Sequence, residues 1–232
     1  MARLPRIDVP DLPQHLMIRG NNRAALFHDD ADRWVFLKQL EFASSTYGCS
    51  LHAYVLMSNH VHLLATGHEH GAVSNMMQSI GRRYARFVNV RQGRTGTLFE
   101  GRFKASLVES DRYFLTCMRY IESNPVRAGM VPHPGACFWS SFRANASGAP
   151  DQPLVAHPTY LALANDDLRR GEAYQRLFDY EIPDEDLAAI RASLHKDRVL
   201  GCDKFRAHLE AELQRPVGIE PHGGARKFKG TG

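Results

Sequence analysis

Hydrophobic side chains alternate with polar or small ones along residues 51–65, LHAYVLMSNHVHLLA. A period of two residues is typical of β-strands, in which successive side chains point to opposite faces. The alternation is interrupted once, at Ser58 and Asn59, whose side chains favour a turn. The segment therefore predicts a hairpin whose second strand begins at His60.

Three other segments repeat hydrophobic residues every three or four positions, which predicts amphipathic helices. Asp29 and Asp30 offer N-cap oxygens to the first helix, and Ser110 with Asp111 caps the third. Two short β-patterned runs predict further strands. The helices are expected at about residues 29–47, 71–90 and 110–123. A strand is expected at 14–19, and one strand or a pair of strands at about 98–108.

The predicted order is strand, helix, two strands, helix, strand, followed by an additional helix. This order matches the ferredoxin-like split βαβ arrangement, an α+β fold with an antiparallel sheet. We expect the helices on one face of the sheet, so that the other face is free for a ligand. These elements lie within residues 1–149, which we take as one domain.

A helical extension is predicted at residues 150–222. The polar stretch from Asn145 to Pro153 is typical of a linker. Beyond it, helical periodicity at residues 187–194 and 205–213 flanks Gly201, and a helix-turn-helix and a plain helical hairpin are equally consistent with this pattern. Residues 223–232 form a basic tail that we expect to be disordered.

The composition is that of a globular protein, because 44% of the 232 residues are hydrophobic and 23% are charged. No apolar run approaches the ~20 residues that cross a membrane, and no signal peptide is visible. We therefore expect a cytoplasmic protein with no membrane partner. The four cysteines are scattered without a C-x-x-C pair, which argues against a zinc knuckle and a disulfide framework.

Positive charge is concentrated in one segment, although the net charge is only +4. Basic side chains neutralise nucleic-acid phosphates, and the interleaved aromatic rings can stack on unpaired bases. The plainer alternative is a solvated helix face with its aromatic rings in the core. We expect mostly core aromatic residues and mostly functional basic ones, because Glu100 is the single acid among them. The basic residues are Arg82, Arg83, Arg86, Arg91, Arg94, Arg102 and Lys104.

His60 and His62 are two residues apart, so on a strand their imidazoles project from one face about 7 Å apart. This geometry suits two ligands of one metal ion, although two partly exposed histidines without a ligand role give the same pattern. A third ligand can come from the third predicted helix. There Tyr120 and Asn124 share a face, and Pro125 favours ending the helix at Asn124.

Together these residues suit phosphodiester transesterification on DNA. A divalent cation held by His60, His62 and Asn124 would polarise a scissile phosphate. Tyr120 would attack the phosphorus and store the bond energy as a phosphotyrosine. Its phenol must lose a proton during the attack, and His52 is a candidate base, although a histidine on a neighbouring strand is more often structural.

Three motifs carry a resemblance to a known family. HLMIRGNNR, LHAYVLMSNHVHLLA and YIESNPVRAGMV occur in this order along the chain. Together they are similar to the single-tyrosine (HUH) transposases of insertion sequences, and more closely to the REP-associated tyrosine transposases. The resemblance covers roughly residues 12 to 145.

This resemblance implies a single-stranded DNA endonuclease and strand-transferase that acts at hairpin-forming palindromic repeats. It implies that His60 and His62 bind Mg²⁺ or Mn²⁺, and that Tyr120 is the nucleophile that becomes linked to a 5′ phosphate. Asn124 takes the third-ligand position, where the wider group often carries Gln, and Tyr113 is expected to have a packing role. The implied partner is single-stranded or hairpin DNA, and both a monomer and a homodimer are open. The DNA-binding candidates are Arg19, Asn21, Arg23, Arg82, Arg83, Arg86, Arg94, Arg102 and Lys104.

Two other classes of function compete with this interpretation. A binding module could recognise palindromic repeats without cutting them, but the intact set of His60, His62, Tyr120 and Asn124 argues against a loss of catalysis. A histidine-motif nucleotidyl hydrolase needs a third alternating histidine, and position 64 is Leu.

Overall fold

The computed structural model describes residues 6–150 and 153–218. Within these ranges, four antiparallel strands form one sheet in the order β2-β3-β1-β4, with β1 paired to both β3 and β4. The order of strands and helices is that of the split βαβ fold, so the predicted α+β class is confirmed. The strands are β1 (Pro13–Arg19), β2 (Cys49–Leu56), β3 (His60–Gly67) and β4 (Lys104–Leu107).

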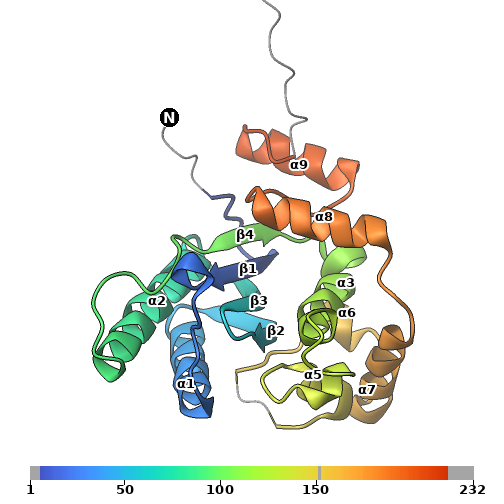
Figure 1. The fold of residues 1–232 in the computed structure, drawn as a ribbon. Coiled ribbons are helices and arrows are strands. Elements are labelled where there is room, and N and C mark those ends of the chain that lie inside the picture. Colours follow the sequence, from blue (N-terminus) through green and yellow to red (C-terminus); the bar gives the residue numbers. More distant parts are fainter. Residues whose placement is uncertain (1–5, 151–152, 219–232) are drawn as a thin grey trace, which may run out of the picture.

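Two helices, α1 (Asp30–Thr46) and α2 (Ala72–Arg91), cover one face of the sheet (Figure 1). Their apolar residues form one core cluster with the strand residues that point to this face. The Asp29 carboxylate accepts a hydrogen bond of 3.0 Å from the backbone N–H of Asp32. The predicted N-cap of the first helix is therefore confirmed.

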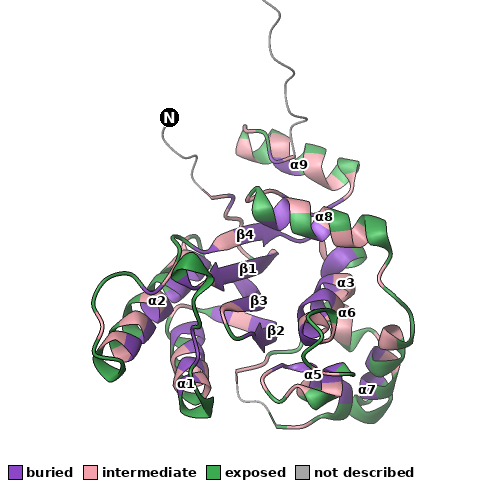
Figure 2. Ribbon diagram, viewed as in Figure 1, coloured by how far each residue is buried: buried purple, intermediate pink, exposed green. Residues whose placement is uncertain are grey.

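The opposite face, which we expected to be free for a ligand, is instead covered by α3 (Ser110–Glu122) and by parts of the extension. Val55 and Leu64 from the sheet are fully buried in a second core cluster. Figure 2 shows that most of the sheet is buried. Tyr174 and Ile190 of the extension complete this cluster, and both are fully buried. On this face, solvent can therefore reach only those parts of the sheet that these helices do not cover.

The chain beyond α3 is largely helical, as the sequence predicts. The backbone N–H of Leu200 donates to Leu107 of β4, which fastens the extension to the edge of the sheet. In the described ranges no helix is long and apolar enough to cross a lipid bilayer. These helices are α4 (Asn124–Arg127), α5 (Phe142–Ser147), α6 (Pro158–Leu161), α7 (Asp167–Arg176), α8 (Asp184–His195) and α9 (Asp203–Leu213), and single 3₁₀ turns lie at 21–23, 134–136 and 177–179.

Two assignments made from the sequence are not tested by this architecture. The choice between a helix-turn-helix and a plain helical hairpin for α8 and α9 stays open, and the division into domains at residue 149 stays a prediction. The predicted basic tail at 223–232 lies outside the described residues.

The linker predicted from Asn145 onward is wrong at its start, because Asn145 belongs to α5 and is buried. Its side-chain amide donates to Glu122 Oε1 at 2.8 Å and to the backbone oxygen of His52 at 3.2 Å. Glu122 is fully buried and also accepts from Ser141 Oγ at 2.6 Å and from Tyr174 Oη at 2.7 Å. A buried carboxylate needs such donors. The cluster ties the end of α3 to α5 and α7.

Two local predictions before α3 have different outcomes. A strand does lie within residues 98–108, since β4 spans four residues there, and Phe99 forms an isolated bridge to Gly20, just after β1. The N-cap of α3 is Glu109, with Ser110 as the first helical residue, and no side chain caps this end. Ser110 therefore lies one position too far inside the helix to act as the cap.

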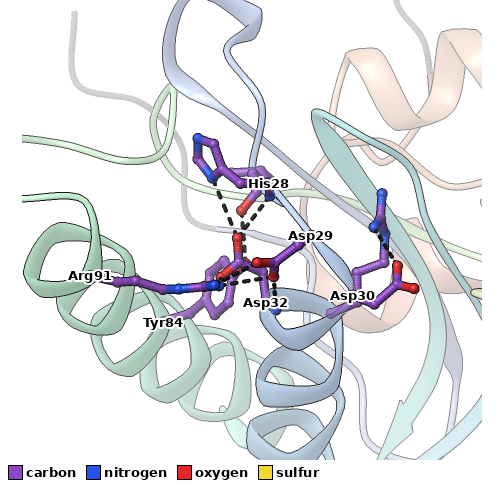
Figure 3. A network of polar contacts seen from close by, with 8 residues as sticks. His28, Asp29, Asp30, Asp32, Tyr84 and Arg91 are labelled. Carbon is purple, nitrogen blue, oxygen red and sulfur yellow. Dashed lines mark hydrogen bonds and ion pairs between the residues drawn. The ribbon is translucent and has the colours of Figure 1, made fainter.

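An ion-pair network joins the start of α1 to the end of α2 (Figure 3). Arg91 donates to both carboxylate oxygens of Asp29, at 2.9 and 2.5 Å, and to Asp32, whose side chain is 1% exposed. The hydrogen bond from Arg91 holds the pKa of Asp29 well below its ordinary value. Arg91 belongs to the basic segment predicted to bind nucleic acid, but two carboxylates neutralise it and its role is structural.

We expect Arg91→Gln to destabilise the fold, because it leaves the buried Asp32 carboxylate without its cationic partner. The free energy of unfolding at pH 7 should fall by about 1–3 kcal/mol, as measured by chemical denaturation. The folded pKa of Asp29 is depressed, so its stabilising contribution is present above pH ~4 and is lost as the pH falls through that folded value. Arg86→Gln, at an exposed position of α2, is the control. An equal decrease in the free energy of unfolding in the two variants would contradict the stabilising role of the network.

Candidate active site

A pocket of about 280 Å³ lies beside α3, β1 and β3. It brings together the three candidate metal ligands, His60, His62 and Asn124, and the candidate nucleophile Tyr120. They come from β3, the last turns of α3 and the start of α4, and they meet only in the folded chain. The other lining residues are Met17, Arg19, Lys104, Arg191, Leu194 and His195.

The first candidate ligand, His60, has a defined tautomer. Its Nδ1 lies 2.7 Å from Oδ1 of Asn59, and the Asn59 amide nitrogen in turn donates to the backbone oxygen of Arg23 at 3.1 Å. Because an amide oxygen only accepts hydrogen bonds, the proton of His60 is on Nδ1. Its Nε2 therefore keeps a lone pair for a ligand.

The second candidate ligand, His62, is 5% exposed, and its ring centroid lies 5.1 Å from that of His60. Its Nδ1 shares a hydrogen bond of 2.8 Å with Nε2 of His15 on β1. This contact leaves Nε2 of His62 as the nitrogen available to a ligand. His15 is fully buried, and its Nδ1 has no hydrogen-bond partner among the described residues. An unpaired buried atom is unfavourable, so we interpret His15 as a residue that orients His62 rather than one that stabilises the fold.

These histidines are neutral at physiological pH. Burial, aided by the charge of Arg19, lowers the pKa of His60 to about 4. Burial also lowers the pKa of His62 well below its ordinary value and the pKa of His15 to about 3. Metal binding requires an unprotonated imidazole nitrogen. The protonation states of His60 and His62 therefore suit metal ligands.

Asn124 is held at the junction of α3 and α4. Its Nδ2 donates to the backbone oxygens of Tyr120 and Ile121, at 3.1 and 3.2 Å. The last carbonyls of a helix lack intrahelical partners, and here the amide nitrogen satisfies two of them. Because the nitrogen is used in this way, the amide oxygen of Asn124 is the atom that can bind a cation.

This donor set fits a divalent cation, since two neutral imidazole nitrogens and one amide oxygen line the same pocket. Within the part of the chain that is described, no three His, Cys, Asp or Glu side chains gather as a metal site. A cation site here thus depends on Asn124 as the third protein ligand. Two imidazoles favour Mn²⁺ over Mg²⁺ on affinity, because Mg²⁺ prefers oxygen ligands.

The Tyr120 side chain is 6% exposed, and its ring centroid lies 6.0 Å from that of His62. The guanidinium carbon of Arg127 lies 4.2 Å from the centre of the Tyr120 ring, and Arg127 donates to the Tyr120 backbone oxygen at 2.6 Å. The hydrogen bond to the backbone anchors the Arg127 guanidinium, and the cation–π contact holds it against the Tyr120 ring. Tyr113 belongs to the core cluster around α3 and does not line the pocket, in agreement with its predicted packing role.

The predicted DNA-binding residues separate into two groups. Arg19 and Lys104 line the pocket, and an adjoining pocket of about 220 Å³ shares both residues and adds Arg102. The structure does not bring the second group to the pocket. It comprises Arg82, Arg83 and Arg86, exposed on α2 across the sheet, Arg94 in the loop after α2, and Asn21 and Arg23 in the turn after β1.

His52, the candidate base, is not part of the pocket. Its Nδ1 donates to the backbone oxygen of Val155 at 2.7 Å, and its Nε2 lies 2.8 Å from Thr66 Oγ1. Burial lowers the pKa of His52 to about 4. Both ring nitrogens are used inside the core, so the role of His52 is structural.

Sequence reasoning missed four residues of the site. His15 has a local signal, because it shares a face of the sheet with the histidine pair. Arg127 also has one, because it lies seven residues after Tyr120, close to two helical turns. Arg191 and His195 lie on α8 in the extension, and no periodicity in the sequence relates that helix to the pocket.

Comparison with known proteins gives a matching family, and two of the solved structures that resemble this chain are described below. The family of IS200-like transposases matches residues 8–124. The structure of a REP-associated tyrosine transposase bound to a REP hairpin is 17% identical, with a TM-score of 0.53, and the match covers 68% of this chain and 93% of that one. The structure of a proposed transposase from Deinococcus radiodurans R1 is 21% identical, with a TM-score of 0.35. That match covers 53% of this chain and 95% of the other. No curated protein matches the chain.

We expect His15→Leu to weaken the binding of Mn²⁺ by about 10–100-fold, because leucine cannot orient the His62 ring through Nδ1. Isothermal titration of the purified protein with MnCl₂ measures this change. The fold should persist, since leucine is apolar and the substitution removes an unpaired buried nitrogen. His70→Gln, at an exposed histidine outside the pocket, is the control. Unchanged Mn²⁺ affinity in His15→Leu would rule out the orienting role.

Proposed function

The chain belongs to the family of IS200-like transposases, and from this premise we propose that it is a metal-dependent single-stranded DNA endonuclease and strand-transferase. The proposed intermediate is a protein–DNA adduct in which Tyr120 is covalently bonded to a 5′ phosphate. The observation that carries the proposal is the presence of Tyr120, His60 and His62 in one pocket with cationic walls. A covalent intermediate conserves the energy of the broken bond, which a transposase needs to rejoin strands.

In the proposed reaction, the Tyr120 oxygen attacks the phosphorus of a phosphodiester. The bond from phosphorus to the 3′ oxygen breaks, and that oxygen takes up a proton to become a 3′ hydroxyl. The 5′ phosphate stays on Tyr120, and the phenolic proton passes to solvent. Rejoining is the reverse reaction: a 3′ hydroxyl attacks the phosphotyrosine, and the Tyr120 oxygen leaves and regains its proton.

His60, His62 and Asn124 are proposed to hold Mg²⁺ or Mn²⁺. The bound cation supplies Lewis-acid polarisation of the phosphate and offsets the charge that develops in the transition state. The protein orients the two imidazoles through their outer nitrogens, with Asn59 behind His60 and His15 behind His62. Such contacts behind the ligands tune the affinity of metal sites.

Single-stranded or hairpin DNA is the proposed substrate. A REP hairpin is bound to the REP-associated transposase that shares this fold. In this chain Arg19 and Lys104 line the pocket, and none of the described residues that line it is acidic. Cationic side chains of this kind bind phosphates on either side of a cleaved bond. Arg82 and Arg86 on α2 are proposed to bind phosphates farther along the DNA.

We expect the wild-type protein to form a covalent adduct with a 3′-labelled single-stranded hairpin from its own genome in Mn²⁺ or Mg²⁺. The adduct is measured in a denaturing gel. Tyr120→Phe should abolish it, because the variant lacks the attacking oxygen. Tyr113→Phe, which removes the other phenol of this helix face outside the pocket, is the matched control and should retain the adduct.

Two results of this experiment would count against the proposal. An adduct that persists in Tyr120→Phe would contradict the assignment of the nucleophile. Tight binding of the hairpin by the wild-type protein without any adduct would instead indicate a DNA-binding module that does not cleave.

A further inference from the structure

One wall of the pocket comes from α8, which lies in the extension and outside residues 8–124 that match the transposase family. Arg191, Leu194 and His195 of α8 line the pocket. Arg191 and His195 are four residues apart, so they lie on the same face of the helix. Some of the basic side chains in the pocket, Arg191 and His195, therefore come from outside the region that matches the family.

The fold fixes α8 in this place without the help of a ligand. Ile190 of α8 is fully buried in the core cluster around α3. Just after the helix, Asp197 accepts a hydrogen bond of 3.0 Å from the backbone N–H of Ala105 in β4. Lys104 donates to Nδ1 of His195 at 3.3 Å. These contacts connect α8 to the core and to the edge strand β4, beside which it lies in Figure 1. Arg191 is therefore presented from a supported helix.

The charges around Arg191 are unbalanced. Arg191 is exposed and makes no ion pair or hydrogen bond within the described ranges. Partial burial lowers the pKa of Arg127, and the positive charge of Arg191 adds to this effect while Tyr120 opposes it. Arg19 has an acidic neighbour, Glu100, at 3.9 Å. Several cations that converge on one pocket, with little acid to neutralise them, create a site for an anion.

We propose that Arg191 binds a backbone phosphate of the DNA at the point of cleavage, so that the C-terminal extension is part of the active site. This inference rests on the proposed function, which identifies the anion as DNA. A guanidinium can donate to two phosphate oxygens at once, which favours Arg over Lys at such a position. Lys104, held by His195, lies on the same pocket wall and contributes a second charge.

The first test is equilibrium binding of a fluorescent single-stranded hairpin oligonucleotide to the full chain carrying Tyr120→Phe, which prevents cleavage. Arg191→Ala should weaken binding about tenfold and reduce the slope of log affinity against log salt by roughly 0.7. Arg191→Lys should keep most of that slope, because the charge remains. Lys196→Ala, at an exposed lysine that does not line the pocket, is the matched control and should behave as its parent.

A second measurement separates phosphate binding from a structural role. The three linkages at and beside the expected cleavage point are replaced, one at a time, by uncharged methylphosphonates. The loss caused by Arg191→Ala should disappear for one of these oligonucleotides, because the contacted charge is already absent. A loss that persists with all three would overturn the proposal.

The rate of adduct formation with Tyr120 intact distinguishes the two hypotheses. An adduct in wild type that forms about tenfold more slowly in Arg191→Ala supports both. An adduct with unchanged rate and unchanged binding in Arg191→Ala overturns the role of Arg191 and leaves the proposed function standing. No adduct in wild type, with binding that still depends on Arg191 and on one phosphate, rejects the cleavage function and supports the phosphate site.

Discussion

The two-residue period of β3 is the constraint on which the site depends. Val61 and Leu63 are buried in the core beneath α1 and α2, and this burial forces His60 and His62 to the opposite face. A shift in register by one residue would place imidazoles in that core and remove the apolar side chains from it. Hydrophobic burial on one face therefore fixes the position of the candidate ligands on the other.

The candidate nucleophile is fixed by a separate set of contacts. Glu122, two residues after Tyr120, is tied to α5 and α7 by buried hydrogen bonds, and Arg127 covers the Tyr120 ring. Several groups around this pocket are unfavourable for stability alone, including the unpaired Nδ1 of His15 and the gathered cations. Sites that depart from the rules of stable packing in this way are often functional.

Patterns between neighbouring residues made much of the fold predictable. The hairpin of β2 and β3, the cap of α1 by Asp29 and the break in the helix at Asn124 all depend on local chemistry, and they occur as expected. The covering of the second face and the approach of α8 to the pocket depend on contacts between distant segments, such as Leu200 with Leu107. Composition likewise could not reveal the role of Arg91, because its carboxylate partners belong to the start of another helix.

In the proposed metal site, Nε2 of His60, Nε2 of His62 and the amide oxygen of Asn124 converge on one cation beside Tyr120. Anomalous X-ray scattering from crystals grown with Mn²⁺ tests it most directly. We expect a single strong peak in the pocket, within coordination distance of these three atoms and adjacent to the Tyr120 hydroxyl. A peak bound by other residues, or a pocket without a peak at saturating Mn²⁺, would contradict it.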